Sequence, residues 1–424
     1  MQSLFHWRRN CFLTLTGMVA WLAGPNGARA AADWPEFRGP TGQGTSTARN
    51  LPLRWGRDSK NIAWQQAVPG RGWSSPALQG GRLYLTTAVT PEGQGNPSLR
   101  ALCLNAATGK ILWDKEVFAH TGPTGIHSKN SHASPTPLVE GDRLYAHFGH
   151  QGTACLDLDG QVLWRSTTLK YPPVHGSGGS PIVAGDALIF SADGSSEPFI
   201  AALNKLTGAL LWKTPRSVEA KKKFSFSTPL LITVGGRQQV ISPGSAAVCA
   251  YDPKDGRELW RVRYAEGYSV VPRPVFGHGL IYLSTAFDRP VVMAIRPDGT
   301  GDVTETHVAW TLAKSAPNTP SPLLIGDELY FVSDAGIASC VDARTGKVHW
   351  SERVGGNYSA SPVHADGRIY LQNEEGVGVV LAPGKTFQEL ARNDLGERTL
   401  ASAAVTDGAI FIRTESRLLR IAAH

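Results

Sequence analysis

The chain has 424 residues, of which 42% are hydrophobic and 18% charged, with 46 glycines, 28 prolines and 12 tryptophans. This composition is too apolar and too aromatic for a disordered chain, and too rich in glycine for a helical bundle. The formal net charge is a modest +7 and no basic run exceeds Lys221 to Lys223, so no nucleic-acid partner is expected.

The first 30 residues follow the pattern of an export signal. Arg8 and Arg9 form a basic start, residues 11–24 are apolar, and residues 28–30 read Ala-Arg-Ala, typical of a cleavage site. No cysteine near that site offers a lipid anchor, and no stretch is apolar over the roughly 18 residues that a membrane helix needs. We expect a signal peptide over residues 1–30, no transmembrane segment, and a mature protein that is periplasmic or secreted.

The rest of the chain aligns with itself in eight units. Most units begin with Ser-Pro or Thr-Pro, and a hydrophobic pair follows after about six residues. Their starts are mostly 40 to 48 residues apart, which is the period of a β-propeller blade. The eight starting positions are Ser75, Thr136, Ser180, Thr228, Arg273, Ser321, Ser361 and Ser402.

Within each unit, short turns rich in glycine separate strand-like segments, as in a four-stranded meander. In the first unit these turns are Gly80-Gly81 and Thr108-Gly109-Lys110, and the second leads into a strand that contains Trp113. A residue that recurs at one place in successive blades most simply packs between them. We therefore expect a structural role for Trp113, Trp164, Trp212, Trp260, Trp310 and Trp350.

The eighth unit lacks its last strand, because no glycine turn and no tryptophan follow Ile421. A matching segment, Asn-Ile-Ala-Trp, stands at the other end of the repeat as residues 61–64. An N-terminal strand that completes the last blade would close the ring and remove its open edges. The prediction is an all-β fold: an eight-bladed β-propeller of four-stranded antiparallel blades over residues 61–424, preceded by an N-terminal strap over residues 31–60.

Two phrases in the turns carry a family resemblance. They run from Asn105 through Thr108-Gly109-Lys110 to Trp113, and from Asp342 through Thr345-Gly346-Lys347 to Trp350. They resemble the repeats of PQQ-like, or quinoprotein-type, β-propellers, which include the exported assembly factors of the BamB type. The resemblance covers about residues 61–424 and implies the propeller fold. It leaves function open, because one fold hosts many functions.

The family includes both binding proteins and oxidoreductases. Alcohol-oxidising quinoproteins carry two adjacent cysteines under their cofactor, whereas this chain has no such pair. Its four later cysteines lie in different units, too far apart for disulfides, and are expected as buried thiols. They are Cys103, Cys155, Cys249 and Cys340.

One face of the ring is the candidate functional surface. In an up-and-down blade, the loop that leads into the first strand and the connection from the second strand to the third share one face. These segments vary between units, as expected of a binding surface carried on loops. The largest insertion, residues 118–131, lies there as a rim. Residues expected to line an axial pocket are Trp73, His127, Lys129, His132, His175, Asp193, Arg273, Asn318, Asp334, Tyr358, Glu374 and Arg413.

Some of these residues have plausible structural roles. Loop histidines often cap backbone groups, and Asp193 with Gly194 forms a simple turn signal. Arg273 replaces the Ser or Thr of the other units, which indicates either an anion clamp at the axis or an ion pair with Glu374 or Asp334. The histidines and Asp193 come from different loops without ligand spacing, so no metal site is predicted.

We interpret the chain as an exported, monomeric binding or scaffold module whose partner is an envelope or extracellular protein or a polymer. No catalytic residue and no cofactor are expected. The alternative is a quinoprotein-like oxidoreductase, or another enzyme, with an axial-pocket site built on His127, His175 and Arg273. That alternative would bring PQQ and calcium as cofactors.

Overall fold

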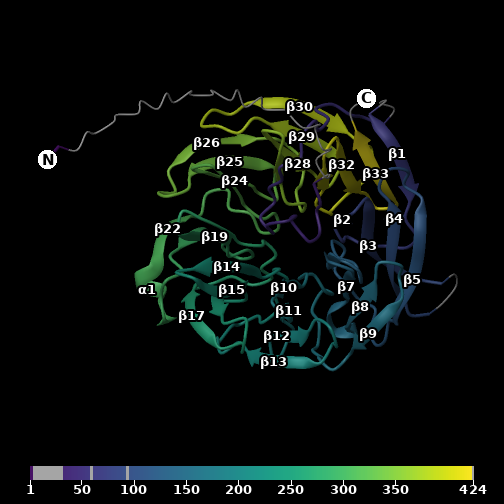
Figure 1. Ribbon diagram of the computed structural model, residues 1–424, viewed down its shortest axis with the longest axis horizontal. Coiled ribbons are helices and arrows are strands. Elements are labelled where there is room, and N and C mark those ends of the chain that lie inside the picture. Colours follow the sequence, from purple (N-terminus) through teal and green to yellow (C-terminus); the bar gives the residue numbers. More distant parts are fainter. Residues whose placement is uncertain (3–31, 58–60, 92–94, 423–424) are drawn as a thin grey trace. The chain divides into compact units, whose positions relative to one another are not determined.

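The computed structural model describes residues 1–2, 32–57, 61–91 and 95–422. Residues 31–424 form a compact unit of their own, and all but the first two residues of the expected signal peptide lie outside the described residues. The described part of this unit is a ring of eight antiparallel sheets around a central axis (Figure 1). The eight-bladed propeller predicted from the repeat is confirmed. No described helix is long and apolar enough to cross a membrane.

Blades one to four follow the chain from the inner strand outwards. Blade one contains β2 (Ala77–Gln79), β3 (Arg82–Val89), β4 (Ser98–Asn105) and β5 (Ile111–Ala119). Blade two contains β6 (Leu138–Glu140), β7 (Arg143–His147), β8 (Thr153–Asp157) and β9 (Val162–Ser166), with the short helix η1 (Gly149–Gln151). Blade three contains β10 (Ile182–Ala184), β11 (Ala187–Ala192), β12 (Phe199–Asn204) and β13 (Leu210–Pro215). Blade four contains β14 (Leu230–Val234), β15 (Arg237–Pro243), β16 (Ala247–Tyr251) and β17 (Glu258–Arg263).

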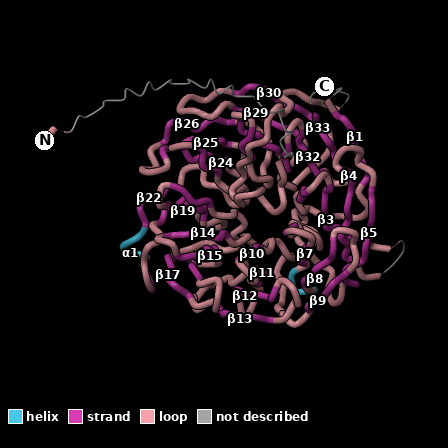
Figure 2. Tube along the Cα trace, viewed as in Figure 1, coloured by secondary structure: helices cyan, strands magenta, loops and turns pink. Residues whose placement is uncertain are grey.

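Blades five to seven repeat this order. Blade five contains β18 (Val275–Gly277), β19 (Leu280–Ser284), β20 (Val292–Ile295) and β22 (Val308–Leu312). Blade six contains β23 (Leu323–Ile325), β24 (Glu328–Val332), β25 (Ile337–Asp342) and β26 (Val348–Arg353). Blade seven contains β27 (Val363–Ala365), β28 (Arg368–Gln372), β29 (Val377–Leu381) and β30 (Glu389–Asp394). Strands dominate and helix is confined to short turns, as Figure 2 shows.

The last blade joins the two ends of the ring. It contains β31 (Ala404–Thr406), β32 (Ala409–Arg413) and β33 (Arg417–Ala422), and its outer strand is β1 (Ile62–Ala67). Strand β1 pairs antiparallel with β33, with Trp64 opposite Arg420 and Ala67 opposite Arg417. Closure of the ring by an N-terminal strand, as predicted from the truncated eighth unit, is therefore confirmed.

The tryptophans of the outer strands join neighbouring blades. The indole Nε1 of Trp64 donates a hydrogen bond of 3.1 Å to the carbonyl oxygen of Ala106 in the next blade. Its ring lies against Gly109, where an added Cβ would stand 2.7 Å from the ring and where φ is +74°. Equivalent bonds run from Trp113, Trp164, Trp212, Trp310 and Trp350. The predicted packing role is confirmed for these residues.

Trp260 departs from the pattern for a visible reason. In blade five the third-to-fourth strand connection is longer and contains β21 (Gly301–Asp302) and α1 (Thr304–His307). Strand β21 pairs in parallel with the outer edge of β17, opposite Trp260. The indole is fully buried and donates to Oε1 of Gln239 in its own blade at 2.8 Å. Trp260 still has a structural role. It is covered by β21, the fifth strand of this sheet, instead of packing against a short glycine turn.

The Ser or Thr that opens each unit forms a ring of hydrogen bonds around the axis. The backbone N–H of Ser75 donates to Oγ1 of Thr136 at 3.0 Å, and Thr136 N–H donates to Oγ of Ser180 at 2.9 Å. Six of the eight steps between these described residues are bridged in this way. The repeated hydroxyl therefore joins blade to blade, and Arg273, which has none, interrupts the ring.

The strap crosses the axial channel at one end (Figure 1). Trp34 exchanges backbone hydrogen bonds with Leu78 of β2, and Gly44 accepts one from His364 of β27. Between these points, Arg38 is buried and donates to the carbonyl oxygen of Pro322 beside blade six. The strap thus ties blades one, six and seven to one another.

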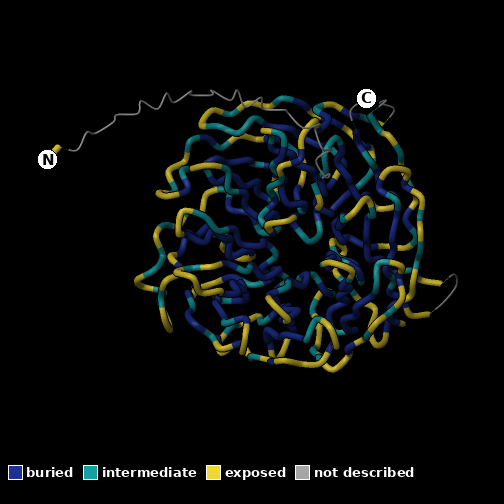
Figure 3. Tube along the Cα trace, viewed as in Figure 1, coloured by how far each residue is buried: buried dark blue, intermediate teal, exposed yellow. Residues whose placement is uncertain are grey.

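The hydrophobic core lies between neighbouring sheets, where buried segments are concentrated, and exposed segments follow the outside of the ring (Figure 3). The four later cysteines belong to this core. Cys103, Cys155, Cys249 and Cys340 are buried and form no disulfide with one another, as predicted. Burial raises the pKa of the Cys249 thiol to about 11, so it is protonated at neutral pH.

Candidate functional site

A cavity of about 560 Å³ opens at the axis on the face of the lead-in loops, the segments that precede the first strand of each blade. All eight lead-in loops contribute to its lining, and Phe37 of the strap closes it below. The volume lies within the range of small-molecule sites. Six of the residues expected from the sequence line it: Trp73, His127, Lys129, His175, Asn318 and Asp334.

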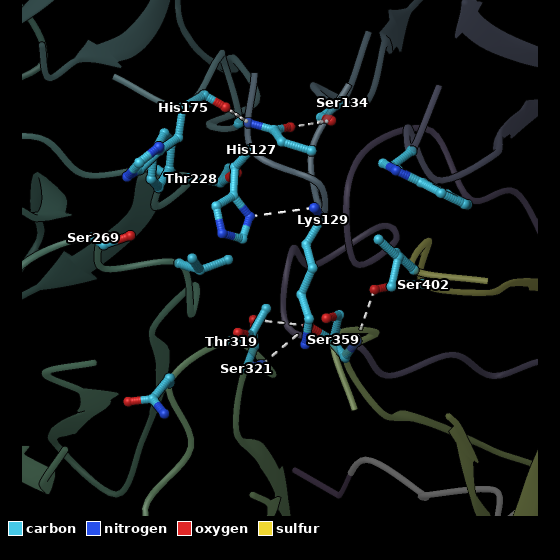
Figure 4. Close-up of a pocket in the computed structure, with 18 of the residues that line it drawn as sticks. His127, Lys129, Ser134, His175, Thr228, Ser269, Thr319, Ser321, Ser359 and Ser402 are labelled. Atoms are coloured by element: carbon cyan, nitrogen blue, oxygen red, sulfur yellow. Dashed lines mark hydrogen bonds between the residues drawn. The ribbon is translucent and has the colours of Figure 1, made fainter. Parts of the chain in front are cut away.

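Glu374 does not line the cavity itself but forms an ion pair with Lys129, which does. The Nζ of Lys129 is 2.8 Å from Oε1 of Glu374, and Ser359 Oγ donates to the same oxygen at 2.6 Å. Figure 4 shows the Lys129 side chain extending from the side of His127 towards Ser359. The 118–131 insertion therefore carries a cation across the mouth of the cavity to blade seven.

Arg273 does not have either of the roles expected from the sequence. Its guanidinium is fully buried, 3.3 Å from Glu36 of the strap, and Nε donates to Pro229 O at 3.0 Å. It pairs with neither Glu374 nor Asp334, and the carboxylate of Glu36 already occupies the place that an anion would take. A smaller hollow of about 300 Å³ on the strap side is lined in part by Glu36 and Arg273.

Asp193 and Arg413 are also structural in this fold. Asp193 forms a two-pronged ion pair with Arg216, with bonds of 2.6 and 3.0 Å between almost fully buried side chains. Arg413 is buried and donates to Ser74 Oγ and Thr86 O, both at 2.7 Å, and so joins blade eight to blade one. Neither residue lines the cavity. The carboxylate of Asp193 is paired with Arg216, and the guanidinium of Arg413 is hydrogen-bonded to blade one.

Tyr358 and His132 lie outside the cavity lining as well. Tyr358 is fully buried in the core between blades six and seven. His132 packs edge-on against His120, with ring centroids 4.4 Å apart, and its Nε2 lies 3.1 Å from the carbonyl oxygen of Thr124. The described residues include no group of three or more His, Cys, Asp or Glu placed to hold a metal ion.

Four rings that the predicted set lacks form one side of the cavity, the aromatic wall: Phe224, Phe226, Tyr268 and Phe287. The centroids of Phe224 and Tyr268 are 5.4 Å apart, and those of Tyr268 and Phe287 are 6.2 Å apart. The sequence signal was the presence of aromatic residues in two consecutive lead-in loops.

The two histidines continue the aromatic wall. The ring centroids of His127 and His175 are 5.2 Å apart, and His175 is 5.2 Å from Phe224. Nδ1 of His127 accepts a hydrogen bond from the backbone N–H of Lys129 at 3.2 Å. Burial and the neighbouring His127 lower the pKa of His175, so its imidazole is neutral at pH 7.

The next side of the cavity, at blade six, is the polar wall, and Asp334 organises it. Its carboxylate accepts hydrogen bonds from the backbone N–H groups of Asn318 and Thr319 and from Oγ1 of Thr319, at 2.6, 3.2 and 2.6 Å. These bonds fix the loop before blade six. They leave Oδ1 of Asn318 buried without a hydrogen-bond partner among the described residues.

Two cavity residues adopt the left-handed backbone region that favours glycine. His175 has φ of +64° and Ser269 has φ of +53°. Such strain costs about 1 kcal/mol or more per residue and persists only where neighbours fix it. Asn130 Nδ2 donates to His175 O at 2.7 Å, and Ser269 N–H donates to Phe224 O at 2.9 Å. The loops that present the wall are thus held in one conformation.

Comparison with known proteins supports the fold and the family. The family described as outer membrane protein assembly factor BamB matches residues 45–196, 196–326 and 301–421. BamB from Moraxella catarrhalis is 14% identical over 85% of this chain and 99% of that chain, with a TM-score of 0.59. No curated protein matches in sequence.

Other solved structures share the propeller. A quinohemoprotein alcohol dehydrogenase from Pseudomonas putida HK5 is 11% identical over 93% of this chain and 81% of that chain, with a TM-score of 0.60. The computationally designed Ika8 protein is 11% identical over 84% of this chain and 98% of that chain, also with a TM-score of 0.60. At these identities the likeness is one of fold alone. The family match, in contrast, spans nearly the whole ring, and the chain belongs to the family described as outer membrane protein assembly factor BamB.

Proposed function

We propose that the protein is an exported, non-catalytic binding module that holds an envelope or extracellular partner in the axial cavity. One observation carries the proposal: all eight lead-in loops converge on one cavity, and two of its residues are held in strained conformations. A fixed concave surface of this kind suits recognition. The export pattern of residues 1–30 and the BamB-type family favour a periplasmic or secreted location.

The chemistry of the lining favours binding over catalysis. An activated nucleophile needs a hydroxyl or thiol in hydrogen-bond contact with a base. Among the described cavity residues no hydroxyl is bonded to His127 or His175. Most hydroxyl oxygens at the floor instead accept a hydrogen bond from a backbone N–H of the preceding blade. Their oxygens help to hold the ring together, and none is bonded to a base.

The residues present do not fit the cofactor of the alternative function. PQQ carries several carboxylates, and a site for it needs unpaired cations. The cation in the described lining is Lys129, which already pairs with Glu374. Arg273 and Arg413 are buried against other partners, and the described residues offer no cluster of calcium ligands. We therefore derive no oxidation step for this chain.

Photo-crosslinking tests the proposal. A benzophenone amino acid at the exposed Phe287, on the cavity rim, is expected to crosslink a defined partner in the native host. The same group at Leu211, exposed on the outer strand β13, serves as the matched control. Asn318→Trp, which fills part of the cavity, should abolish the crosslink from position 287. Equal crosslinking from both positions, or persistence in Asn318→Trp, would refute the proposal.

A further inference from the structure

The cavity has two chemically different sides. The aromatic wall presents the rings of Phe224, Phe226, Tyr268 and Phe287, whereas the polar wall presents an amide, a hydroxyl and two ion-paired or hydrogen-bonded charged groups. Figure 4 shows hydroxyl groups from several lead-in loops around the same space. A ligand that suits this cavity has one apolar face and many polar groups.

The charges of the cavity exclude an acidic ligand. Lys129 is neutralised by Glu374, and no cation of the described residues lies within salt-bridge distance of Asp334. His175 is neutral at pH 7 because burial and His127 lower its pKa. A carboxylate or phosphate placed here would face Asp334, and the one cation among the described lining residues, Lys129, is already paired. Two further cations, Lys222 and Arg398, lie over the rings of Tyr268 and Trp73 and do not line the cavity. The complementary ligand is therefore uncharged.

The cavity lining contains both hydrogen-bond donors and a hydrogen-bond acceptor that have no partner among the described residues. Thr136, Ser180 and Thr228 each accept a backbone N–H through the hydroxyl oxygen, and their hydroxyl hydrogens have no acceptor among the described residues. These hydrogens are available as donors at the cavity floor. Oδ1 of Asn318 is a buried acceptor without a partner. This acceptor gains a hydrogen bond if the Asn318 side chain, which lines the cavity, turns towards a ligand donor.

From these features we infer that the cavity binds a sugar residue of a neutral oligosaccharide, an inference that rests on the proposed function. A pyranose ring has C–H faces that pack on aromatic rings, and each of its hydroxyls both donates and accepts hydrogen bonds. It satisfies the Asn318 amide and the floor hydroxyls together. A purely apolar ligand would bury these groups without partners, which is unfavourable.

The test uses the full-length protein and five neutral trisaccharides: cellotriose, xylotriose, mannotriose, laminaritriose and β-1,4-galactotriose. Saturation-transfer NMR at millimolar sugar should show transfer to the C–H protons of at least one sugar, and calorimetry should give its affinity. Asn318→Ala and Tyr268→Leu should each weaken binding about tenfold or more. Leu211→Ser, on the outer strand, should leave affinity unchanged. Thermal melting of each variant verifies that the ring is intact.

The outcomes separate the two proposals. Absence of binding to all five sugars, or affinity unchanged in both Asn318→Ala and Tyr268→Leu, overturns the sugar inference. If the crosslink from position 287 still forms and is still lost in Asn318→Trp, the proposed binding function stands without the sugar. If the crosslink is also absent, both fail. Binding that both cavity variants weaken, with Leu211→Ser unaffected, supports the inference.

Discussion

Nζ of Lys129 lies 2.8 Å from Oε1 of Glu374, although 245 residues separate them. The side chain of Lys129 is 45% exposed and that of Glu374 is 10% exposed. The pair therefore joins the rim insertion before blade two to blade seven. Because half of it faces water, its contribution to global stability is modest, about 1 kcal/mol or less. Its effect is local: it holds the insertion over the cavity.

Lys129→Met is expected to loosen that insertion while leaving the ring intact. The apolar stem is kept, but the contact with Glu374 is lost, so the backbone of residues 120–131 should exchange amide hydrogens faster. Hydrogen-exchange mass spectrometry measures this. Lys110→Met, at an exposed turn of blade one, is the control and should change nothing. Unchanged exchange in Lys129→Met would contradict the conclusion that the Lys129–Glu374 ion pair holds the insertion over the cavity.

Asp193→Asn should destabilise the fold strongly. The substitution leaves the Arg216 guanidinium buried without its carboxylate, and breaking one side of a buried pair costs about 3–5 kcal/mol. Urea unfolding measures the change. Asp186→Asn, at an exposed turn of the same blade, should alter stability by less than about 0.5 kcal/mol. Similar values for the two variants would argue against a structural role for Asp193.

Stability should fall as the pH drops from 7.5 to 5. Burial first, and then the neighbouring His150, lower the pKa of His147 from 6.5 to about 3, and burial lowers that of His150 to about 4. Below pH 6.5 the unfolded chain binds protons that the folded chain does not, so acid favours unfolding. For His147 alone the loss at pH 5 is about 2 kcal/mol. Urea midpoints at both pH values test this, and His147→Gln should flatten the dependence.

Substitutions at two glycines distinguish the energetic cost of backbone strain from the cost of lost packing space. Gly81 and Gly109 have φ of +76° and +74°, but only Gly109 has a ring where a Cβ would stand. Gly81→Ala should cost about 1 kcal/mol for its backbone conformation. Gly109→Ala should cost about 2–4 kcal/mol, because Trp64 must also move. Unfolding free energies from urea titration compare them, and equal losses would mean that the Trp64 contact contributes nothing.

The fold could be predicted from the sequence because each blade repeats the same short-range signals. Glycine turns, the Ser or Thr before proline, and the outer-strand tryptophans each occupy one position per blade, so their spacing predicts eight blades. Even the closing strand could be found, since the truncated end and residues 61–64 are complementary. Trp260 shows the limit of this reasoning: its neighbour is an insertion, and no repeat phrase predicts where β21 lies.

The site was predicted less well, because burial and contacts between distant residues depend on the three-dimensional structure. The sequence indicates which loops face the axis, but not how deeply a side chain is buried or which partner it meets. Asp193 pairs with Arg216 and Arg413 with Ser74, while Arg273 pairs with the strap through Glu36. None of these partners stands at a repeat position. The sequence places Phe224, Phe226 and Tyr268 on the lead-in loops, but only the fold shows that their rings pack into one wall.

The closing pair of β1 and β33 sets the order in which the chain can fold. Strand β1 is synthesised before every other strand of the ring and β33 after them, so the eighth blade cannot form until β33 has been made. Until that moment the strap has only some of its contacts with blades seven and eight, and the ring retains two open sheet edges. Closure of the ring therefore waits for β33, and until then the chain needs protection from aggregation through those edges.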